Sequence, residues 1–338
     1  MPGPKQASVQ LPIIDIYQTI LSPSSLSSIS QACKDLGFFL ITNHGISQDL
    51  YNSLYSLSNH LFNLPLDTKL LLGPSTPVNT YTPLFIASPF FESLRVSGPH
   101  YFSSAKSSAD LLFTNNTTTD YTSQFCSVME EYGNKMVELS KRIIAVVLEC
   151  LGDGFEMKYC ESEFSQCHGY LRINNYIAPE VVQEEEEEEE GGNGLGEIEG
   201  LGMHTDMSCI TVLYQDESGG LQVRSKEGWV DIETGEGTLV VNIGDLLQAW
   251  SNGRMRSSAH RVLLKKKKKV RRMSLAFFWC FEDEKVIMAP SDVVGEGKER
   301  IYRPFVCKEY VEFRQSSVQG RFDKVGFTVD DFAAIIGS

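Results

Sequence analysis

The sequence predicts a mainly β protein with flanking α-helices, whose core is a double-stranded β-helix (jelly roll) with helical N-terminal and C-terminal extensions. Between residues 201 and 281, short β-branched and apolar runs alternate with glycine-rich turns, as a jelly roll built of two sheets requires. An amphipathic helix is predicted over residues 123–151, and a shorter helix over residues 307–314. The 338 residues, with a hydrophobic content of 42%, are enough to bury a large core.

We expect three regions along the chain. Residues 1–160 form an N-terminal α/β region, residues 161–303 form the jelly-roll core, and residues 304–338 form a C-terminal helical extension. In the first region, residues 11–16 predict a strand and residues 26–36 a helix that ends at Gly37. Residues 37–42 predict a second strand, and Ser47 can cap the helix that follows it.

Residues 65–122 contain many Pro, Ser and Thr and little periodicity, which predicts loops with short helices. In the helix predicted over residues 123–151, apolar residues recur every three or four positions and form a stripe along one side. We expect this apolar stripe to pack into the core. Its members are Phe125, Met129, Tyr132, Met136, Leu139, Ile143 and Val147. In the last region, we expect a further short helix over residues 329–336.

Two charge runs interrupt the predicted core. Residues 183–200 contain seven consecutive glutamates, Glu184–Glu190, followed by a glycine-rich segment, and after the strand predicted at residues 168–176 this composition predicts a disordered acidic insertion. The glutamates supply half of the formal net charge of −14. The second run, Lys265–Lys269, is interpreted as the solvated tip of a hairpin. The sequence has no basic face of the kind that would indicate a nucleic-acid partner.

Composition also bounds the location and partners of the protein. The chain has no stretch of 18 consecutive apolar residues, so we expect no membrane span. The first residues lack the charged and apolar pattern of a signal region. The eight cysteines are scattered without a C-x-x-C pair, which is typical of a reducing compartment. We therefore expect a monomer in the cytoplasm or the nucleus that takes a small-molecule substrate and binds neither nucleic acid nor a membrane.

The candidate metal site combines His204, Asp206 and His260. The residues around His204 predict a strand, and residues two apart on a strand point to one face, so the imidazole and the Asp206 carboxylate should converge. A second predicted strand could bring His260 beside them. Two His and one carboxylate leave metal positions open, and this is the ligand set of non-haem Fe(II) oxygenases.

Arg272 and Ser274 form a candidate carboxylate grip. They share one face of the strand predicted over residues 270–279. A guanidinium offers paired N–H donors and a serine adds a hydroxyl, which together suit a carboxylate. The anionic ligand that this predicts would lie between the grip and the metal.

With His204-Thr205-Asp206, His260 and Arg272-x-Ser274 in this order, the chain resembles the plant 2-oxoglutarate- and Fe(II)-dependent dioxygenase family, which includes the gibberellin oxidases. The resemblance covers nearly the whole chain. Further matching segments are Leu11-Pro12-Ile13-Ile14-Asp15, Gly37-Phe38-Phe39 with Asn43-His44-Gly45, Gly219-Gly220-Leu221, Asn242-Ile243-Gly244-Asp245 and Ser251-Asn252-Gly253-Arg254.

The resemblance implies a role for each residue of the site. His204, Asp206 and His260 would bind Fe(II), while Arg272 and Ser274 would bind the distal carboxylate of the co-substrate 2-oxoglutarate. Members of the family also use an Asn and a Tyr near the co-substrate, and these correspond to Asn174 and Tyr176. Between them Asn175 departs from the family, which usually has a Tyr. No catalytic residue beyond the metal ligands is implied, O₂ is the second co-substrate, and ascorbate is expected to support activity.

The implied reaction is oxidation of a small, largely apolar plant metabolite in hormone or secondary metabolism, with release of succinate and CO₂. A gibberellin-like acid is the first candidate, and Phe90, Phe91 and Phe278 are candidate residues of the substrate pocket. Three alternatives stay open at this point. They are a non-haem iron oxidase that uses ascorbate, a zinc hydrolase with a similar ligand set, and a catalytically inactive small-molecule sensor on the same fold.

Overall fold

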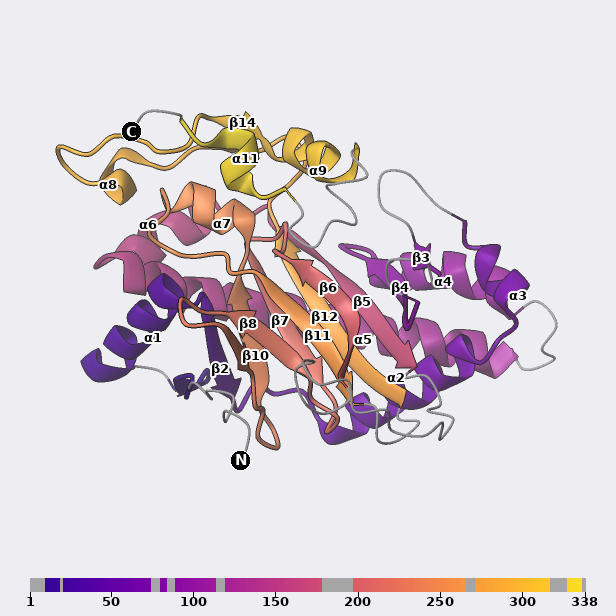
Figure 1. The fold of residues 1–338 in the computed structure, drawn as a ribbon. Coiled ribbons are helices and arrows are strands. Elements are labelled where there is room, and N and C mark those ends of the chain that lie inside the picture. The colour runs from indigo at the N-terminus through magenta and orange to yellow at the C-terminus, as the bar shows by residue number, and fades with distance from the viewer. Residues whose placement is uncertain are drawn as a thin grey trace, which may run out of the picture.

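In a computed structural model of the chain, residues 10–18, 21–73, 80–83, 89–113, 119–177, 197–265, 271–316 and 327–335 are described (Figure 1). The elements before the core are β1 (Ile13–Asp15), α1 (Pro23–Asp35), β2 (Phe38–Thr42), α2 (Gln48–Phe62), α3 (Leu66–Leu70), β3 (Tyr81–Thr82), β4 (Phe91–Ser97), α4 (Tyr101–Leu112), α5 (Thr119–Leu151) and α6 (Phe155–Ser162). The core contains β5 (His168–Ile177), β6 (Glu197–His204), β7 (Ile210–Gln215), β8 (Leu221–Arg224), β9 (Trp229–Asp231), β10 (Leu239–Ile243), α7 (Asp245–Trp250), β11 (His260–Lys265) and β12 (Arg271–Cys280). The last elements are β13 (Val286–Ile287), α8 (Ser291–Val294), β14 (Phe305–Val306), α9 (Cys307–Ser316) and α11 (Val329–Ala333).

Two sheets form the core, and the predicted jelly roll is confirmed. Among the described residues, the larger sheet has eight strands in the order β1-β2-β10-β7-β12-β5-β4-β3, and the smaller has four in the order β6-β11-β8-β9. The chain passes back and forth between them, because β6, β8 and β11 lie in the smaller sheet while β7, β10 and β12 lie in the larger. Phe38, Leu40 and Val240 of the larger sheet pack against Leu221 and Val223 of the smaller one.

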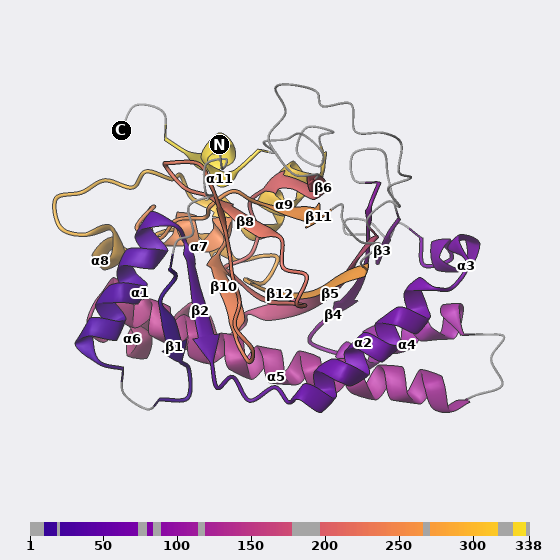
Figure 2. The same ribbon diagram turned by 60° about the horizontal axis from the view of Figure 1, so that its bottom comes forward.

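Helix α5 covers the other face of the larger sheet (Figure 2). The apolar stripe predicted for this helix is confirmed as core, because Phe125, Met129, Tyr132, Met136, Leu139, Ile143 and Val147 are all buried. They join Ile173, Leu275 and Phe277 from the larger sheet in one cluster. The larger sheet is therefore apolar toward α5, which leaves its opposite face free to carry polar residues toward the smaller sheet.

Two local predictions of the N-terminal region are confirmed. The helix α1 ends as expected at Gly37, which has a φ of 68° and whose N–H donates to the Ala32 carbonyl. Ser47 caps α2, because its Oγ accepts a hydrogen bond of 3.3 Å from the Leu50 N–H. At the other end of the chain, α9 and α11 lie together over one end of the core, next to α7 (Figure 1).

Three sequence predictions need correction. Residues 65–122 contain the seven-residue strand β4, which sequence reasoning missed because Glu92 and Arg95 conceal its alternation. The acidic insertion predicted over 183–200 ends earlier, because residues 197–200 belong to β6 and pair with β11. The core also contains a helix, α7, where short strands were expected. Residues 183–196 of the insertion and residues 266–269 of the lysine run lie outside the described residues.

The division of the chain at residues 160 and 303 stays a prediction. The topology adds that β1, β2, β3 and β4 of the first region are strands of the same larger sheet that the core builds. Within the described residues, no helix combines the length and the apolar composition needed to cross a lipid bilayer.

A buried ion pair attaches β4 to its surroundings. Glu92 is 2% exposed and accepts hydrogen bonds from Lys69 Nζ at 2.8 Å, Tyr81 OH at 2.5 Å and Asn175 Nδ2 at 2.8 Å. These donors come from three different elements, α3, β3 and β5. The pair therefore holds this strand near the edge of the sheet in position.

We predict that Lys69→Met lowers the free energy of unfolding by about 3–5 kcal/mol, because the Glu92 carboxylate would stay buried without a cation. Urea denaturation followed by circular dichroism measures the change. Lys106→Met is the matched control, since its ion pair with Asp110 leaves the two side chains 53% and 52% exposed. The control should leave the midpoint unchanged, and equal midpoints for the two variants would contradict the prediction.

Candidate metal centre

Two histidines face each other across neighbouring strands of the smaller sheet. His204 is the last residue of β6 and His260 the first of β11, and the antiparallel register places them directly opposite each other. The Nδ1 of His204 lies 2.8 Å from the Gly202 carbonyl oxygen, and the Nδ1 of His260 lies 3.1 Å from the Ser258 carbonyl oxygen. A ring that donates from Nδ1 to a carbonyl keeps the lone pair on Nε2, so both histidines can present Nε2 to a metal.

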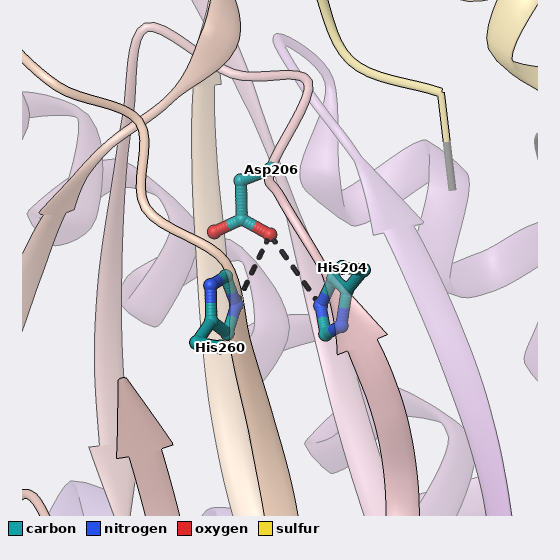
Figure 3. A group of neighbouring side chains, drawn as sticks. All are labelled: His204, Asp206 and His260. Carbon is teal, nitrogen blue, oxygen red and sulfur yellow. Dashed lines mark ion pairs between the residues drawn. The ribbon is translucent and has the colours of Figure 1, made fainter. Parts of the chain in front are cut away.

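Asp206 completes the group from the loop that crosses from the smaller sheet to the larger one. Its Oδ1 lies 3.8 Å from Nε2 of His204 and 3.6 Å from Nε2 of His260, and the three side chains point toward one another (Figure 3). The expectation that His204 and Asp206 share one strand is wrong, because β6 ends at His204. The two side chains converge because the loop turns, and strand alternation plays no part.

The second carboxylate oxygen of Asp206 is anchored to the larger sheet. Thr211 Oγ1 donates to Oδ2 at 2.6 Å and Asn242 Nδ2 donates to it at 2.8 Å. Oδ1 is thus left for a metal, while Oδ2 fixes the orientation of the carboxylate. Sequence reasoning missed Thr211, and it noted Asn242 only as part of a segment that matches the family.

The three side chains fit a metal ion in position and protonation. One ligand atom from each lies within 4.8 Å of the others. Burial and the neighbouring His260 lower the pKa of His204 to about 4, so its imidazole is neutral at pH 7. Burial alone would raise the pKa of Asp206, but the two imidazoles and the hydrogen bonds from Thr211 and Asn242 bring it below its usual value. A neutral imidazole and an ionised carboxylate are the forms that bind a metal.

The predicted carboxylate grip lies on the face of the larger sheet that is turned toward the smaller one. Arg272 Nη1 lies 3.4 Å from Ser274 Oγ, which also accepts a hydrogen bond of 3.2 Å from Asn174 Nδ2. In the register, Arg272 is opposite Tyr176, and Ser274 is opposite Asn174. The guanidinium carbon of Arg272 lies 4.7 Å from the centre of the Tyr176 ring. The structure therefore brings together the four residues that were predicted to hold a co-substrate.

Arg272 is buried but has no anion as a partner among the described residues. It is 2% exposed, and its guanidinium donates to the Gly219 carbonyl oxygen at 2.5 Å and to Gln215 Oε1 at 3.0 Å. Within the described part of the chain it forms no ion pair. Asn174 Oδ1 beside it is buried, and none of the described residues gives it a hydrogen bond. Because burial of an unpaired charge is costly, this arrangement fits an anionic ligand that completes it.

The other predicted residues have separate places. Asn175 points to the opposite face of β5, where it accepts a hydrogen bond of 2.6 Å from Arg271 Nε, so the departure from the family pattern does not change the grip. Phe90 and Phe91 pack with Tyr176. Phe278 lies elsewhere, stacked on Tyr170 with ring centroids 4.8 Å apart. The three candidate pocket phenylalanines therefore do not form one cluster.

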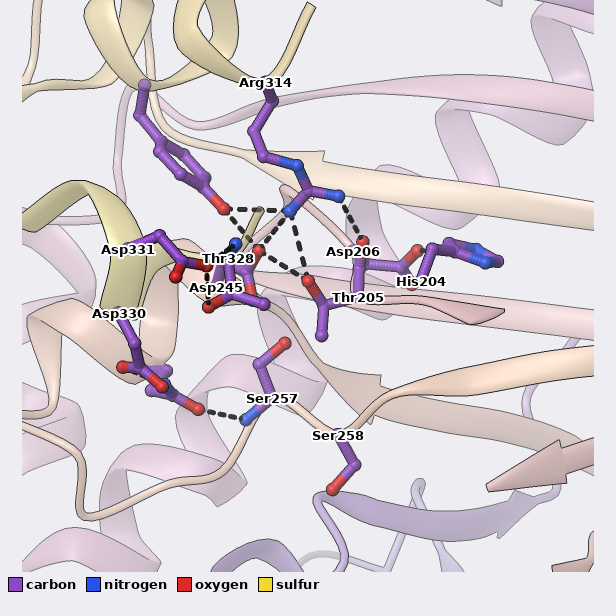
Figure 4. Close-up of polar contacts among 12 residues, drawn as sticks. His204, Thr205, Asp206, Asp245, Ser257, Ser258, Arg314, Thr328, Asp330 and Asp331 are labelled. Atoms are coloured by element: carbon purple, nitrogen blue, oxygen red, sulfur yellow. Dashed lines mark hydrogen bonds and ion pairs between the residues drawn. The ribbon is translucent and has the colours of Figure 1, made fainter. Parts of the chain in front are cut away.

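A buried polar network supports the loop of Asp206 from the outside (Figure 4). Arg314 of α9 donates through Nη2 to the Thr205 carbonyl oxygen at 3.1 Å and through Nη1 to Asp245 Oδ2 at 2.6 Å. Thr205 Oγ1 and Tyr310 OH donate to the same Asp245 oxygen, at 2.9 and 2.5 Å. Sequence reasoning interpreted Asp245 as a carboxylate that fixes a turn, but nothing in the spacing indicated Arg314.

Comparisons with known proteins point to one family. The profile of the 2OG-Fe(II) oxygenase superfamily matches residues 168–281, and that of the non-haem dioxygenase N-terminal region matches residues 11–89. A gibberellin 20-oxidase-like protein of Arabidopsis thaliana is 52% identical over 97% of this chain and 98% of its own length. A rice dioxygenase for auxin oxidation has a TM-score of 0.71 at 25% identity, over 91% of this chain and 95% of its own. JOX2, solved in complex with 2OG, Fe and JA, has a TM-score of 0.70 at 25% identity, over 93% and 87%.

The anchoring of Asp206 gives a testable expectation. Thr211→Val keeps the shape of the side chain but removes the hydroxyl that donates to Oδ2, so the affinity for a divalent metal should fall about 10- to 100-fold. Titration with Co(II), followed by its visible absorption, measures this. Thr238→Val is the control, because that hydroxyl donates to the Gly235 carbonyl away from the site. An unchanged Co(II) affinity in Thr211→Val would rule out this role for the hydroxyl.

The Arg314 network gives a second expectation. Arg314→Met should lower the free energy of unfolding by about 3–5 kcal/mol, because Asp245 would remain buried as an unpaired carboxylate. The double variant Arg314→Met/Asp245→Asn should recover part of this loss, since the uncompensated charge is gone. Urea denaturation of the three proteins measures both changes. A double variant less stable than Arg314→Met would show that charge burial is not the cause.

Proposed function

Because this chain belongs to the 2-oxoglutarate- and Fe(II)-dependent oxygenase superfamily and is a 2-oxoglutarate-dependent dioxygenase, we propose that His204, Asp206 and His260 hold its iron. The two Nε2 atoms and Oδ1 of Asp206 converge on one point and come from one side. This arrangement supports a three-ligand face with positions left for the co-substrates. When bound, the iron supplies O₂ activation, with 2-oxoglutarate giving succinate and CO₂ as the substrate is oxidised.

We propose that Arg272, Ser274, Asn174 and Tyr176 bind 2-oxoglutarate. The observation that carries this proposal is the Arg272 guanidinium, which is 2% exposed and without an ion pair among the described residues. Ser274 Oγ and the orphan Asn174 Oδ1 lie beside it. In this proposal a dicarboxylate neutralises the guanidinium with one end and would ligate the metal with the other. The match to the 2-oxoglutarate and Fe(II) oxygenase family favours 2-oxoglutarate over ascorbate, which the alternative oxidase would use.

The substrate is proposed to be a small, largely apolar metabolite of the gibberellin type. The 52% identity to a gibberellin 20-oxidase-like protein over nearly the full length of both chains supports this class. Phe278, stacked on Tyr170, lies beside Thr211 in the register and so is near Asp206, which makes it our first candidate for a substrate contact. Phe90 and Phe91 are proposed to border the same space from the side of Tyr176.

We further propose that the protein acts as a monomer in the cytoplasm or the nucleus and that ascorbate supports its turnover. The eight cysteines are all unpaired, which supports a reducing compartment. The protein's own part in catalysis is positional. Thr211 and Asn242 orient the Asp206 carboxylate, and the buried guanidinium of Arg272 holds the co-substrate away from water.

The test begins with binding of 2-oxoglutarate to the Fe(II)-loaded protein without oxygen, followed by visible absorption. Arg272→Met should weaken this binding about 10- to 100-fold, because one charge-assisted contact is lost. Arg271→Met is the matched control, since that neighbour points to the other face of β12 and bonds Asn175 and Asn63. With oxygen admitted, a gibberellin should stimulate succinate formation. Equal 2-oxoglutarate affinities in the two variants would contradict the assignment of Arg272.

A further inference from the structure

Two arginines lie side by side on the inner face of the larger sheet, outside the groups described so far. Across four neighbouring strands, four residues lie opposite one another and form one row: Leu213, Ala276, Arg172 and Arg95. This row starts from Val240, which packs against the smaller sheet, so all of its members are on the face turned toward that sheet. Side chains directly opposite each other on antiparallel strands are neighbours. The row therefore ends in two adjacent positive charges.

Among the described residues, neither arginine is neutralised by its neighbours. Arg172 Nη1 donates to two hydroxyls, those of Ser93 at 2.8 Å and Thr82 at 3.3 Å. The Nε of Arg95 is buried and finds no hydrogen-bond partner in the described part of the chain. In the described ranges, neither guanidinium forms an ion pair with a carboxylate. Burial, together with the charge of Arg95, lowers the pKa of Arg172.

This pattern differs from that of the structural arginine of the protein. Arg314 is 6% exposed and has Asp245 at 2.6 Å, whereas Arg95 and Arg172 are only partly buried and have no such partner among the described residues. Like charges placed directly opposite each other on a sheet repel and are destabilising. Two adjacent, half-buried guanidiniums therefore favour the binding of an anion, which the described residues do not supply.

An aromatic stack connects the arginines to the metal centre. The guanidinium carbon of Arg95 lies 3.9 Å from the centre of the Tyr170 ring, and Tyr170 stacks on Phe278 at 4.8 Å with 13° between the ring planes. Phe278 is opposite Thr211, whose hydroxyl holds Asp206. One strand, β12, separates the strand of Arg172 from that of Thr211, so their backbones are about 10 Å apart. A small molecule can span this distance.

We propose that Arg95 and Arg172 form a receptor for the carboxylate of the substrate, with the skeleton of the substrate lying against Tyr170 and Phe278 and its oxidised carbon toward the metal. This inference rests on the proposed function and narrows its substrate to an apolar carboxylic acid. The receptor is distinct from the 2-oxoglutarate grip. Arg272 lies on another strand and four residues away from Ala276, the residue opposite Arg172.

The apolar side of the receptor decides which anion it takes. Planar guanidiniums match the paired oxygens of a carboxylate. The neighbouring rings of Tyr170 and Phe278 offer apolar surface next to the charges, which suits a hydrocarbon skeleton carrying one acid group. The acid should be several bonds from the oxidised carbon, because the two ends of the molecule contact different strands.

The test compares acids with their uncharged derivatives. Gibberellins, indole-3-acetic acid and fatty acids, each with its methyl ester, are titrated into the protein loaded with Co(II) and 2-oxoglutarate, and binding is measured by calorimetry. At least one acid should bind more tightly than its ester. Arg95→Met and Arg172→Met should each weaken the acid about 10- to 100-fold and leave the ester unchanged. Arg95→Lys, which keeps the charge, should bind the acid with intermediate affinity.

Arg142→Met is the matched control. This exposed arginine also stacks on a tyrosine, with its guanidinium carbon 4.3 Å from the Tyr17 ring centre, but on the outside of α5. It should bind acids and esters like the unchanged protein. Circular dichroism and the retained binding of 2-oxoglutarate show that each variant is folded.

The outcomes separate this inference from the proposed function. Three outcomes would overturn the receptor. The esters could bind as well as the acids, the acids could bind equally well to both methionine variants, or no acid could bind at millimolar concentration. Succinate release stimulated by a neutral substrate would then still uphold the dioxygenase reaction. Conversely, acid binding that depends on Arg95 and Arg172, without succinate formation in the Fe(II)-loaded protein, would show a carboxylate site at these arginines but contradict both its role in substrate binding and the proposed oxidation of that acid.

Discussion

The carboxylate of Asp206 is the constraint on which the site depends, because it joins the two sheets. One of its oxygens faces the two histidines of the smaller sheet, and the other accepts hydrogen bonds from Thr211 and Asn242 of the larger sheet. This single side chain therefore links the two sheets at the candidate metal centre. On its outer side the same loop is held by Arg314, through the Thr205 carbonyl. A centre built in this way has its ligand geometry preformed before any ion arrives.

The inner face of the larger sheet arranges its chemistry in three neighbouring rows. One row, through Asn242, Thr211, Phe278 and Tyr170, supports the metal centre. Another contains Gln215, Ser274 and Asn174 next to Arg272. The row between them ends in the two arginines of the proposed receptor. Because strand alternation sends every second residue to this face, the residues of the three proposed functions share one sheet without competing for positions.

The charges of this protein are unevenly distributed, with arginines concentrated on the inner face of the larger sheet of an acidic chain. The whole chain carries a formal charge of −14, yet the inner face of the larger sheet holds the buried Arg272 and the partly exposed Arg95 and Arg172, none of them in an ion pair with a described carboxylate. In a site screened from water, such charges attract anions far more strongly than they would on the surface. The edge that carries Arg95 is held in turn by a buried pair of opposite sign on the outer face, Lys69 with Glu92. On β4, Glu92 of the outer face thus holds the strand in position, while Arg95 of the inner face belongs to the proposed receptor.

Much of this was determined by the sequence alone. Strand alternation placed Arg272 beside Ser274, and apolar spacing indicated the buried face of α5, because both features depend only on local periodicity. The family motifs indicated His204, Asp206 and His260. The sequence could not show how Asp206 reaches the histidines, since a loop conformation is decided by its contacts.

Only the tertiary structure decided which polar residues meet. Arg314 and Thr205 are far apart in the chain, and Arg95 and Arg172 lie on strands that helices separate, so no spacing could connect them. The strand β4 escaped prediction for a related reason: Glu92 reads as solvent-exposed until Lys69, Tyr81 and Asn175 are seen around it. Local periodicity specifies the face that a residue occupies, whereas its partners across the sheet follow from the register, which the whole fold determines.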